Sequence, residues 1–131
     1  MPELVTVTSF YTGLLAILFL IISIRAILGR RDARVSVGDG NDKVLRKKIR
    51  VQANFVEYAP FAVILLAMAE LQGTRAMVLH ILGLMLLSGR ILHAIGLGHT
   101  PQIIPARRFG MYLTVGMIFL AALLNIWHAI F

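Results

Sequence analysis

The stretch RVQANFVEYAPFAVILLAMAEL, residues 50–71, decides how many times this chain crosses a membrane. Its second half is apolar from Ala59 to Ala69, whereas its first half carries a cluster of polar side chains. By hydropathy alone it is the least certain of four candidate spans. We interpret it as a span, because the spans on either side of it must be connected across the bilayer.

The composition is that of an integral membrane protein. The 131 residues are 59% hydrophobic and 15% charged, with a mean hydropathy of +0.85, which is too apolar for a small soluble domain. A helix needs about 20 predominantly apolar residues to cross the hydrocarbon core. Runs of that length occupy residues 5–28, 49–71, 76–97 and 109–131. We therefore predict one all-α domain, an integral membrane four-helix bundle with helices at about 5–28, 43–71, 76–97 and 107–131.

The first connection, residues 29–42, is the only substantial linker that the sequence predicts. Turn and cap residues fill its second half, so Asp42 or Asn41 is a candidate N-cap for a helix that begins near Lys43. Basic residues gather in and beside this connection, and Arg107 and Arg108 follow the third span, whereas the second connection offers only Arg75. The positive-inside rule then places connections one and three in the cytoplasm and both termini on the other side.

The net charge of +7 indicates anionic membrane lipids as partners. Nucleic acid is not expected as a partner, because the charge follows a membrane-proximal rim without interleaved aromatic residues. Cysteine is absent from the chain, which excludes disulfides, a thiolate nucleophile and a cysteine-ligated metal. No metal site is predicted, and any thiol chemistry must use a thiol supplied by a ligand.

The polar cluster R-x-Q-x-N-x-x-E-Y-x-P is the main candidate site. Arg50, Asn54 and Glu57 fall at i, i+4 and i+7, so they share one face of a helix. A charged residue near mid-bilayer costs ~2.5 to 3.5 kcal/mol on insertion scales, so charges kept there indicate a functional site. The alternative is an Arg and Glu pair that only holds two helices together.

Other polar residues in the spans allow similar alternatives. Arg90 and His93 lie at i, i+3 on one helix face, where they either line a site or Arg90 reaches out to the lipid headgroups. The isolated His80, Asn125 and His128 are predicted to form hydrogen bonds between helices or to lie at interfaces.

The polar cluster resembles the second-helix signature of the MAPEG family, the membrane-associated proteins in eicosanoid and glutathione metabolism. The signature is closest to that of leukotriene C synthase, and the chain is also similar to microsomal glutathione transferases. Arg90 and His93 match an Arg-x-x-His motif near the end of the third helix in microsomal prostaglandin E synthase. Arg108 and Tyr112 match the arginine and tyrosine that begin its fourth helix. The resemblance covers essentially the whole chain.

The resemblance implies a homotrimer with glutathione as co-substrate, held between neighbouring subunits near the cytoplasmic face. Arginines are implied as carboxylate clamps, Glu57 as partner of the ammonium group, and polar side chains as partners of the peptide. The implied glutathione-binding residues are Arg30, Arg34, Arg50, Gln52, Asn54, Glu57, Tyr58, Arg90, His93 and Tyr112. Arg108, with Arg107 as the alternate, is implied as the catalytic arginine that favours the thiolate.

The resemblance further implies a membrane-bound glutathione-dependent transferase or peroxidase for lipophilic electrophiles, in a small bacterial member placed in the inner membrane. Two departures stand against it, since Leu97 replaces a family tyrosine and Phe109 replaces a serine beside the catalytic arginine. The alternative is a noncatalytic lipid-binding protein that resembles the 5-lipoxygenase-activating protein. The sequence leaves the identity of the lipophilic partner open.

Overall fold

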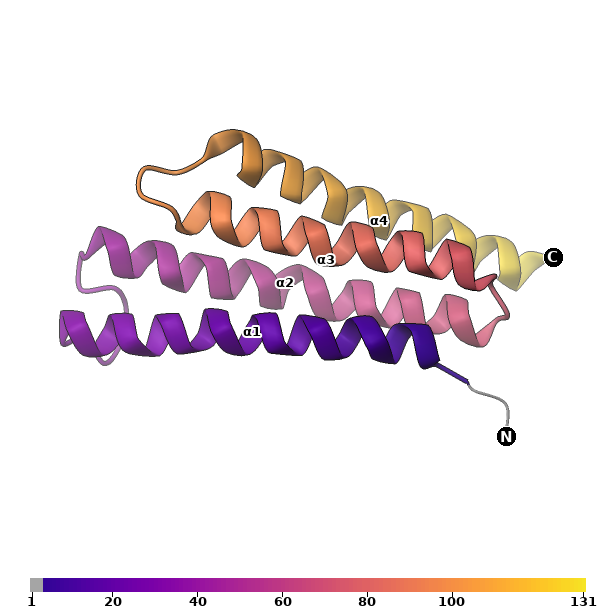
Figure 1. Cartoon of the computed structure of the whole chain (residues 1–131), viewed down its shortest axis with the longest axis horizontal. Helices are drawn as coiled ribbons and strands as arrows, with labels where there is room; N and C mark the ends of the chain where they lie inside the picture. Colours follow the sequence, from indigo (N-terminus) through magenta and orange to yellow (C-terminus); the bar gives the residue numbers. More distant parts are fainter. Residues whose placement is uncertain (1–3) are drawn as a thin grey trace.

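The computed structural model describes residues 4–131, which form four helices and no strand (Figure 1). They are α1 (Thr6–Ala33), α2 (Lys43–Leu71), α3 (Ala76–Gly98) and α4 (Ile104–Ile130). Each of the four is long and apolar enough to cross a membrane. The prediction of an all-α protein with four spans is confirmed. The orientation of the two termini stays a prediction, and residues 1–3 lie outside the described part.

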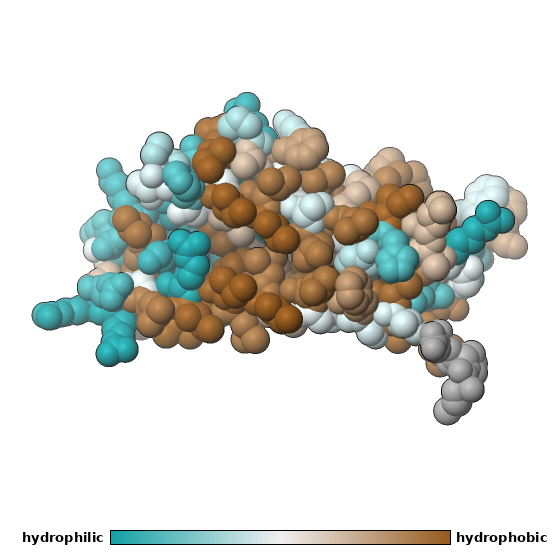
Figure 2. All heavy atoms as spheres, viewed as in Figure 1, coloured by the Kyte–Doolittle hydropathy of each residue, from teal (hydrophilic) through white to brown (hydrophobic). Residues whose placement is uncertain are grey.

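Successive helices run in opposite directions and lie side by side (Figure 1). Within the described residues α1 packs on α2 and α3, and α4 packs on α2 and α3, but α1 and α4 make no contact. Every helix contributes buried side chains to the core, such as Leu15, Leu66, Leu86 and Met117. Apolar side chains dominate the middle of the visible surface, and hydrophilic ones gather at the left end (Figure 2). That distribution suits a bundle whose middle section lies in the hydrocarbon core of a membrane.

One end of the bundle contains the C-termini of α1 and α3 and the N-termini of α2 and α4. We call it the basic end. The linker there is shorter than predicted, because α1 continues past residue 28 to Ala33. Arg30 and Arg31 do not end the helix, since cations in a last turn complement the helix dipole. Arg34 ends it in the left-handed conformation, with φ of 56°. The prediction that the linker begins at residue 29 is therefore wrong.

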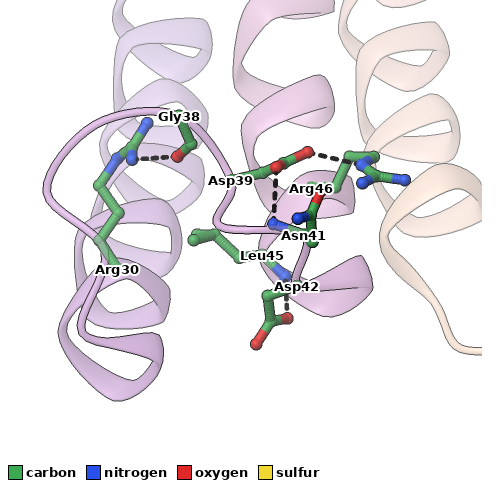
Figure 3. A network of polar contacts seen from close by, with 7 residues as sticks. All are labelled: Arg30, Gly38, Asp39, Asn41, Asp42, Leu45 and Arg46. Atoms are coloured by element: carbon green, nitrogen blue, oxygen red, sulfur yellow. Dashed lines mark hydrogen bonds and ion pairs between the residues drawn. The ribbon is translucent and has the colours of Figure 1, made fainter.

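Hydrogen bonds order the linker at the basic end (Figure 3). Arg30 Nη1 donates to the carbonyl of Gly38 at 2.6 Å, and Arg46 Nε donates to Asp39 Oδ2 at 2.6 Å. The Arg46 guanidinium, helped by the backbone N–H of Asn41, holds the pKa of the Asp39 carboxyl below its usual value. Asp42 is the N-cap of α2, since its Oδ1 accepts from the backbone of Leu45 at 2.9 Å.

At the opposite end, a carboxylate from α2 caps the start of α1. No side chain caps α1 from its own N-cap position. Glu70 accepts instead from the backbone N–H of Val7 at 2.8 Å and from that of Thr8 at 2.7 Å. It also accepts from the Thr8 hydroxyl at 2.6 Å. A negative charge at this place complements the helix dipole, so α1 and α2 are joined at both ends.

Three further polar contacts hold the bundle together. The Tyr11 hydroxyl lies 2.9 Å from His80 Nδ1 and joins α1 to α3. Asn125 Nδ2 donates to the Leu65 carbonyl at 3.0 Å and joins α4 to α2. His128 Nε2 lies 3.1 Å from the hydroxyl of Thr74, in the turn between α2 and α3. The prediction that these isolated polar residues hydrogen-bond across the bundle is confirmed.

Candidate functional site

Arg90 of α3 lies inside the bundle, with only 1% of its surface exposed. Its Nη2 donates to Oδ1 of Asn54 on α2 at 2.5 Å and lies 3.5 Å from Nδ1 of His93. Nε and Nη1 are also buried and find no acceptor among residues 4–131. The alternative in which Arg90 reaches out to the headgroups is therefore wrong. Two donor atoms of the guanidinium are therefore unsatisfied within the described residues, which is unusual for buried polar groups.

Aromatic rings hold the guanidinium in this position. Its central carbon lies 5.8 Å from the ring centre of Phe55 and 5.9 Å from that of Tyr58, both on α2. A cation within about 6 Å of a ring face is attracted by the ring quadrupole. This attraction orients Arg90 but fills none of its hydrogen-bonding capacity. A buried charge without an anionic partner is costly, so an anionic ligand that reached Arg90 would be strongly favoured.

Glycines bring the start of α4 directly against the end of α3. A Cβ at Gly110 would lie 2.5 Å from both the Gly89 carbonyl oxygen and the His93 backbone nitrogen. At Gly96 a Cβ would meet the backbone of Arg107. Only residues without a side chain permit this approach. It sets the two arginines at the start of α4 beside the Arg90 and His93 segment.

A pocket of about 410 Å³ opens beside this contact. Its polar lining comes from Asn54, His93, Arg107, Arg108 and Tyr112, and its apolar lining comes from Ile104 and Met111. Three helices therefore contribute to one cavity at the basic end. The cavity joins a cationic rim to an apolar wall, which is the combination that a polar thiol and an apolar reaction partner require.

The two arginines of the pocket differ in their contacts. Arg107 Nη1 donates to Oε1 of Gln102 at 2.9 Å. Arg108 makes no hydrogen bond or ion pair with any residue in the described part of the chain. All its donors are therefore available to a ligand, whereas one N–H of Arg107 is occupied by a neutral amide. This difference favours Arg108 for the role that the sequence left open between the two.

Arg50 and Glu57 form an ion pair on the outside of α2. Arg50 Nη1 lies 3.8 Å from Glu57 Oε1, and each side chain is 53% exposed. Both residues belong to one helix, so this pair does not hold two helices together. The sequence spacing places Asn54 on the same helix face. In the structure it is 8% exposed, and its side chain contacts Arg90. This part of α2 thus exposes the charges of Arg50 and Glu57 and buries the amide of Asn54.

The remaining predicted residues lie on the α1 side of the subunit. Gln52 Nε2 donates to Oγ of Ser23 at 3.2 Å, Arg30 belongs to the linker network, and Arg34 ends α1. One subunit therefore divides the predicted site into three groups, of which the first is the exposed pair of Arg50 and Glu57 on α2. The pocket group contains Asn54, Tyr58, Arg90, His93, Arg107, Arg108 and Tyr112. The α1 group contains Arg30, Arg34 and Gln52.

Sequence reasoning missed three residues of these surroundings. Ser23 was not proposed, although a hydroxyl in the apolar run of α1 is a recognisable signal. Ile104 and Met111 line the pocket, but nothing distinguishes them from other apolar residues in the sequence. Among the residues described, no group of three or more His, Asp or Glu side chains is placed to hold a metal ion.

Comparisons with known proteins agree on one group. The sequence model of the MAPEG family matches residues 8–127. The chain is also 35% identical over 122 residues to the inner membrane protein YecN of Escherichia coli (strain K12), which covers 93% of this chain and 92% of that protein. YecN of a second Escherichia coli strain is equally similar. With the four spans, these similarities support an integral inner membrane protein.

Proposed function

Because the chain belongs to the MAPEG family, we propose that it is a glutathione-dependent transferase or peroxidase that acts on lipophilic electrophiles within the membrane. The family includes both glutathione transferases and noncatalytic members. The observation that carries the proposal is the buried Arg90, whose Nε and Nη1 have no acceptor among residues 4–131. A small anionic ligand beside Asn54 and His93 would supply that acceptor.

Glutathione suits the charges of the pocket taken together with the buried Arg90 and the exposed pair of Arg50 and Glu57 on α2. It carries two carboxylates, one ammonium group and two amides, so its site needs several cations, one carboxylate and amide partners. Arg90 and Arg50 offer planar forks to the carboxylates, and Glu57 offers an anion to the ammonium group. Asn54 and Tyr58 lie beside Arg90 and complete hydrogen bonds to the peptide.

The division of the predicted residues supports a shared site. Arg30, Arg34 and Gln52 lie on the α1 side of their own subunit, away from the pocket group. In a homotrimer they would reach the pocket of a neighbour, and the exposed Arg50 and Glu57 would lie at the interface. Glutathione would then bridge two subunits near the basic end.

Arg108 is the proposed catalytic residue. A cation a few ångströms from a thiol favours the thiolate, which is the nucleophilic form. The glutathione sulfur then attacks the electrophilic carbon, a carbon–sulfur bond forms, and the leaving group departs with its bonding electron pair. The thiol proton leaves to solvent at the basic end. The exposed apolar residues around Tyr112 offer the electrophile a lateral path from the lipid.

One observation favours the noncatalytic lipid-binding alternative. Leu97, which stands where the family has a tyrosine, is 7% exposed and belongs to the apolar core. This position therefore contributes no polar group to the pocket. A site that binds glutathione without activating it would suit this loss.

The decisive experiment compares thiolate formation with binding. We expect detergent-purified wild-type protein to bind glutathione by calorimetry and to show thiolate absorbance near neutral pH, with conjugation of an apolar aryl halide following the same titration. Arg108→Ala should abolish the thiolate signal and keep most of the binding, because the carboxylate clamps lie on α2 and α3. The matched variant Arg107→Ala should keep both.

The other outcomes separate the alternatives. If Arg107→Ala loses the thiolate signal and Arg108→Ala keeps it, Arg107 is the catalytic residue instead of Arg108. If the wild type binds glutathione without thiolate or turnover, the noncatalytic alternative replaces the enzyme. If the wild type does not bind glutathione, the proposal fails.

A further inference from the structure

A second cavity, of about 180 Å³, lies between α1, α2 and α3. It shares no lining residue with the pocket beside Arg108. Leu18 and Ile22 of α1, Val51 of α2, and Ile91 and Ile95 of α3 form its apolar walls. We call it the α1–α3 trough. The proposed glutathione chemistry makes no use of it.

The trough runs along the helix axes. Its α1 lining extends from Leu18 to Arg25, and its α3 lining extends from Ile91 to Gly98. Seven residues of helix cover about 10 Å along the axis. The small side chain of Ala94 lies between the two isoleucines of α3 and leaves room there. In a membrane-spanning bundle this direction is close to that of the lipid chains.

Two cations stand at the end of the trough nearest the basic end. Arg25 and Lys48 are its only charged lining residues. The Lys48 side chain passes over Gly29, where a Cβ would lie 2.9 Å from its Cδ and 3.5 Å from its Nζ. A glycine at this position therefore lets Lys48 lie across α1 toward the trough. Neither cation has a hydrogen bond or ion pair with any residue of the described chain.

We propose that the α1–α3 trough binds one anionic phospholipid, with an acyl chain along the apolar walls and the phosphate between Arg25 and Lys48. An acyl chain matches an apolar cavity that is elongated along the membrane normal. A negatively charged headgroup at the level of the basic end complements two cations that lack a partner among residues 4–131. This lipid site is independent of the proposed function, because no residue of the glutathione pocket contributes to it.

The test measures lipid binding to the purified full-length protein. Native mass spectrometry and thermal unfolding would be recorded with phosphatidylglycerol and with phosphatidylcholine of the same acyl chains. We expect one retained phosphatidylglycerol and a larger rise in melting temperature than with phosphatidylcholine. Arg25→Gln and Lys48→Gln should each weaken phosphatidylglycerol binding about fivefold. Arg31→Gln, which removes an exposed cation from the same helix outside the trough, should leave it unchanged.

Further variants separate the trough from the general charge of the basic end. Ala94→Leu should fill the trough and abolish retention while both cations remain. If Ala94→Leu does not fold, Ile95→Asn should weaken retention instead, because it places a polar group in the wall of the trough without changing the charge, and Ile95 is exposed. Equal binding of phosphatidylcholine would show a neutral lipophilic occupant and overturn the proposal. Equal protection by glycerol phosphate, or an equal loss in Arg31→Gln, would also overturn it.

Discussion

Arg90 of α3 donates a 2.5 Å hydrogen bond to the side-chain oxygen of Asn54 on α2, in the interior of the bundle. One contact therefore joins the two motifs that the sequence showed separately, the polar cluster of α2 and the Arg-x-x-His of α3. It also gives Asn54 two roles, since the same amide lines the pocket and is a partner of a buried charge.

The first prediction follows from these two roles. Asn54→Ala removes the acceptor of Arg90 Nη2 and leaves the guanidinium with only its 3.5 Å contact to His93 Nδ1. We expect a loss of about 1 to 3 kcal/mol in the free energy of unfolding, together with weaker glutathione binding. Thermal unfolding in detergent with and without glutathione measures both. Gln52→Ala is the control for stability alone, because among residues 4–131 Gln52 bonds to Ser23 of α1 and not to a buried charge. Unchanged stability in Asn54→Ala would contradict the described contact.

The second prediction compares two carboxylates of one helix. Glu57→Gln should weaken glutathione binding by about 1.5 to 3 kcal/mol and leave stability nearly unchanged, because Glu57 is half exposed. Glu70→Gln should lower the stability and leave glutathione binding nearly unchanged. It weakens the cap on Val7 and Thr8, at a cost of about 1 to 3 kcal/mol in stability, and lies at the other end of the bundle from the pocket.

Calorimetry measures the glutathione affinity of the two variants, and unfolding experiments measure their stability. If both variants lose stability and keep glutathione affinity, Glu57 has no role in the ligand site.

The third prediction concerns the contact between α3 and α4. Gly110→Ala would place a Cβ against two backbone atoms, which cannot yield as the end of a flexible side chain can. We expect a loss of about 1 to 3 kcal/mol in stability and weaker thiolate formation, because α4 must move away with Arg108. Gly116→Ala on the same helix is the control, since its Cβ would meet only the Met85 methyl group at 3.5 Å. Equal effects of the two variants would show that the close approach is unimportant.

The fourth prediction concerns orientation in the membrane. Because the chain has no cysteine, Ser36→Cys, Gln72→Cys and Thr100→Cys each introduce a single thiol at an exposed position in one connection. An impermeant maleimide should label only Gln72→Cys in intact cells, since the other two positions belong to the basic end. Labelling of Ser36→Cys instead would reverse the orientation and place the proposed glutathione pocket outside the cytoplasm.

The fifth prediction concerns assembly. If Arg30, Arg34 and Gln52 complete the pocket of a neighbour, native mass spectrometry from a mild detergent should show a mass of three subunits. Glutathione should stabilise that assembly by mass action. A monomer that binds glutathione with undiminished affinity would contradict the shared site.

The sequence predicted those features that depend on hydropathy and on helical spacing. The four spans followed from apolar runs, and the hydrogen bonds of His80, Asn125 and His128 followed from isolated polar residues in such runs. The end of α1 did not follow, because Arg30 and Arg31 are unfavourable in lipid but favourable in a last helical turn that stands outside it.

The pocket was harder to predict because direction around a helix matters as much as position along it. Gln52 belongs to the same short pattern as Asn54, yet two residues turn a helix by about 200°, so their side chains contact different helices. The difference between Arg107 and Arg108 likewise depends on Gln102, whose side chain meets only one of them.

The bond between Glu70 and Thr8 has a consequence for biogenesis. The donors lie in the first turn of the first span, and their acceptor is made 62 residues later. In a chain synthesised from its N-terminus, α1 is therefore complete before the carboxylate that caps it has been made. The start of α1 depends on water or headgroups until α2 has crossed back. The hairpin of α1 and α2, rather than either helix alone, is then the smallest unit that enters the membrane with its helix ends satisfied.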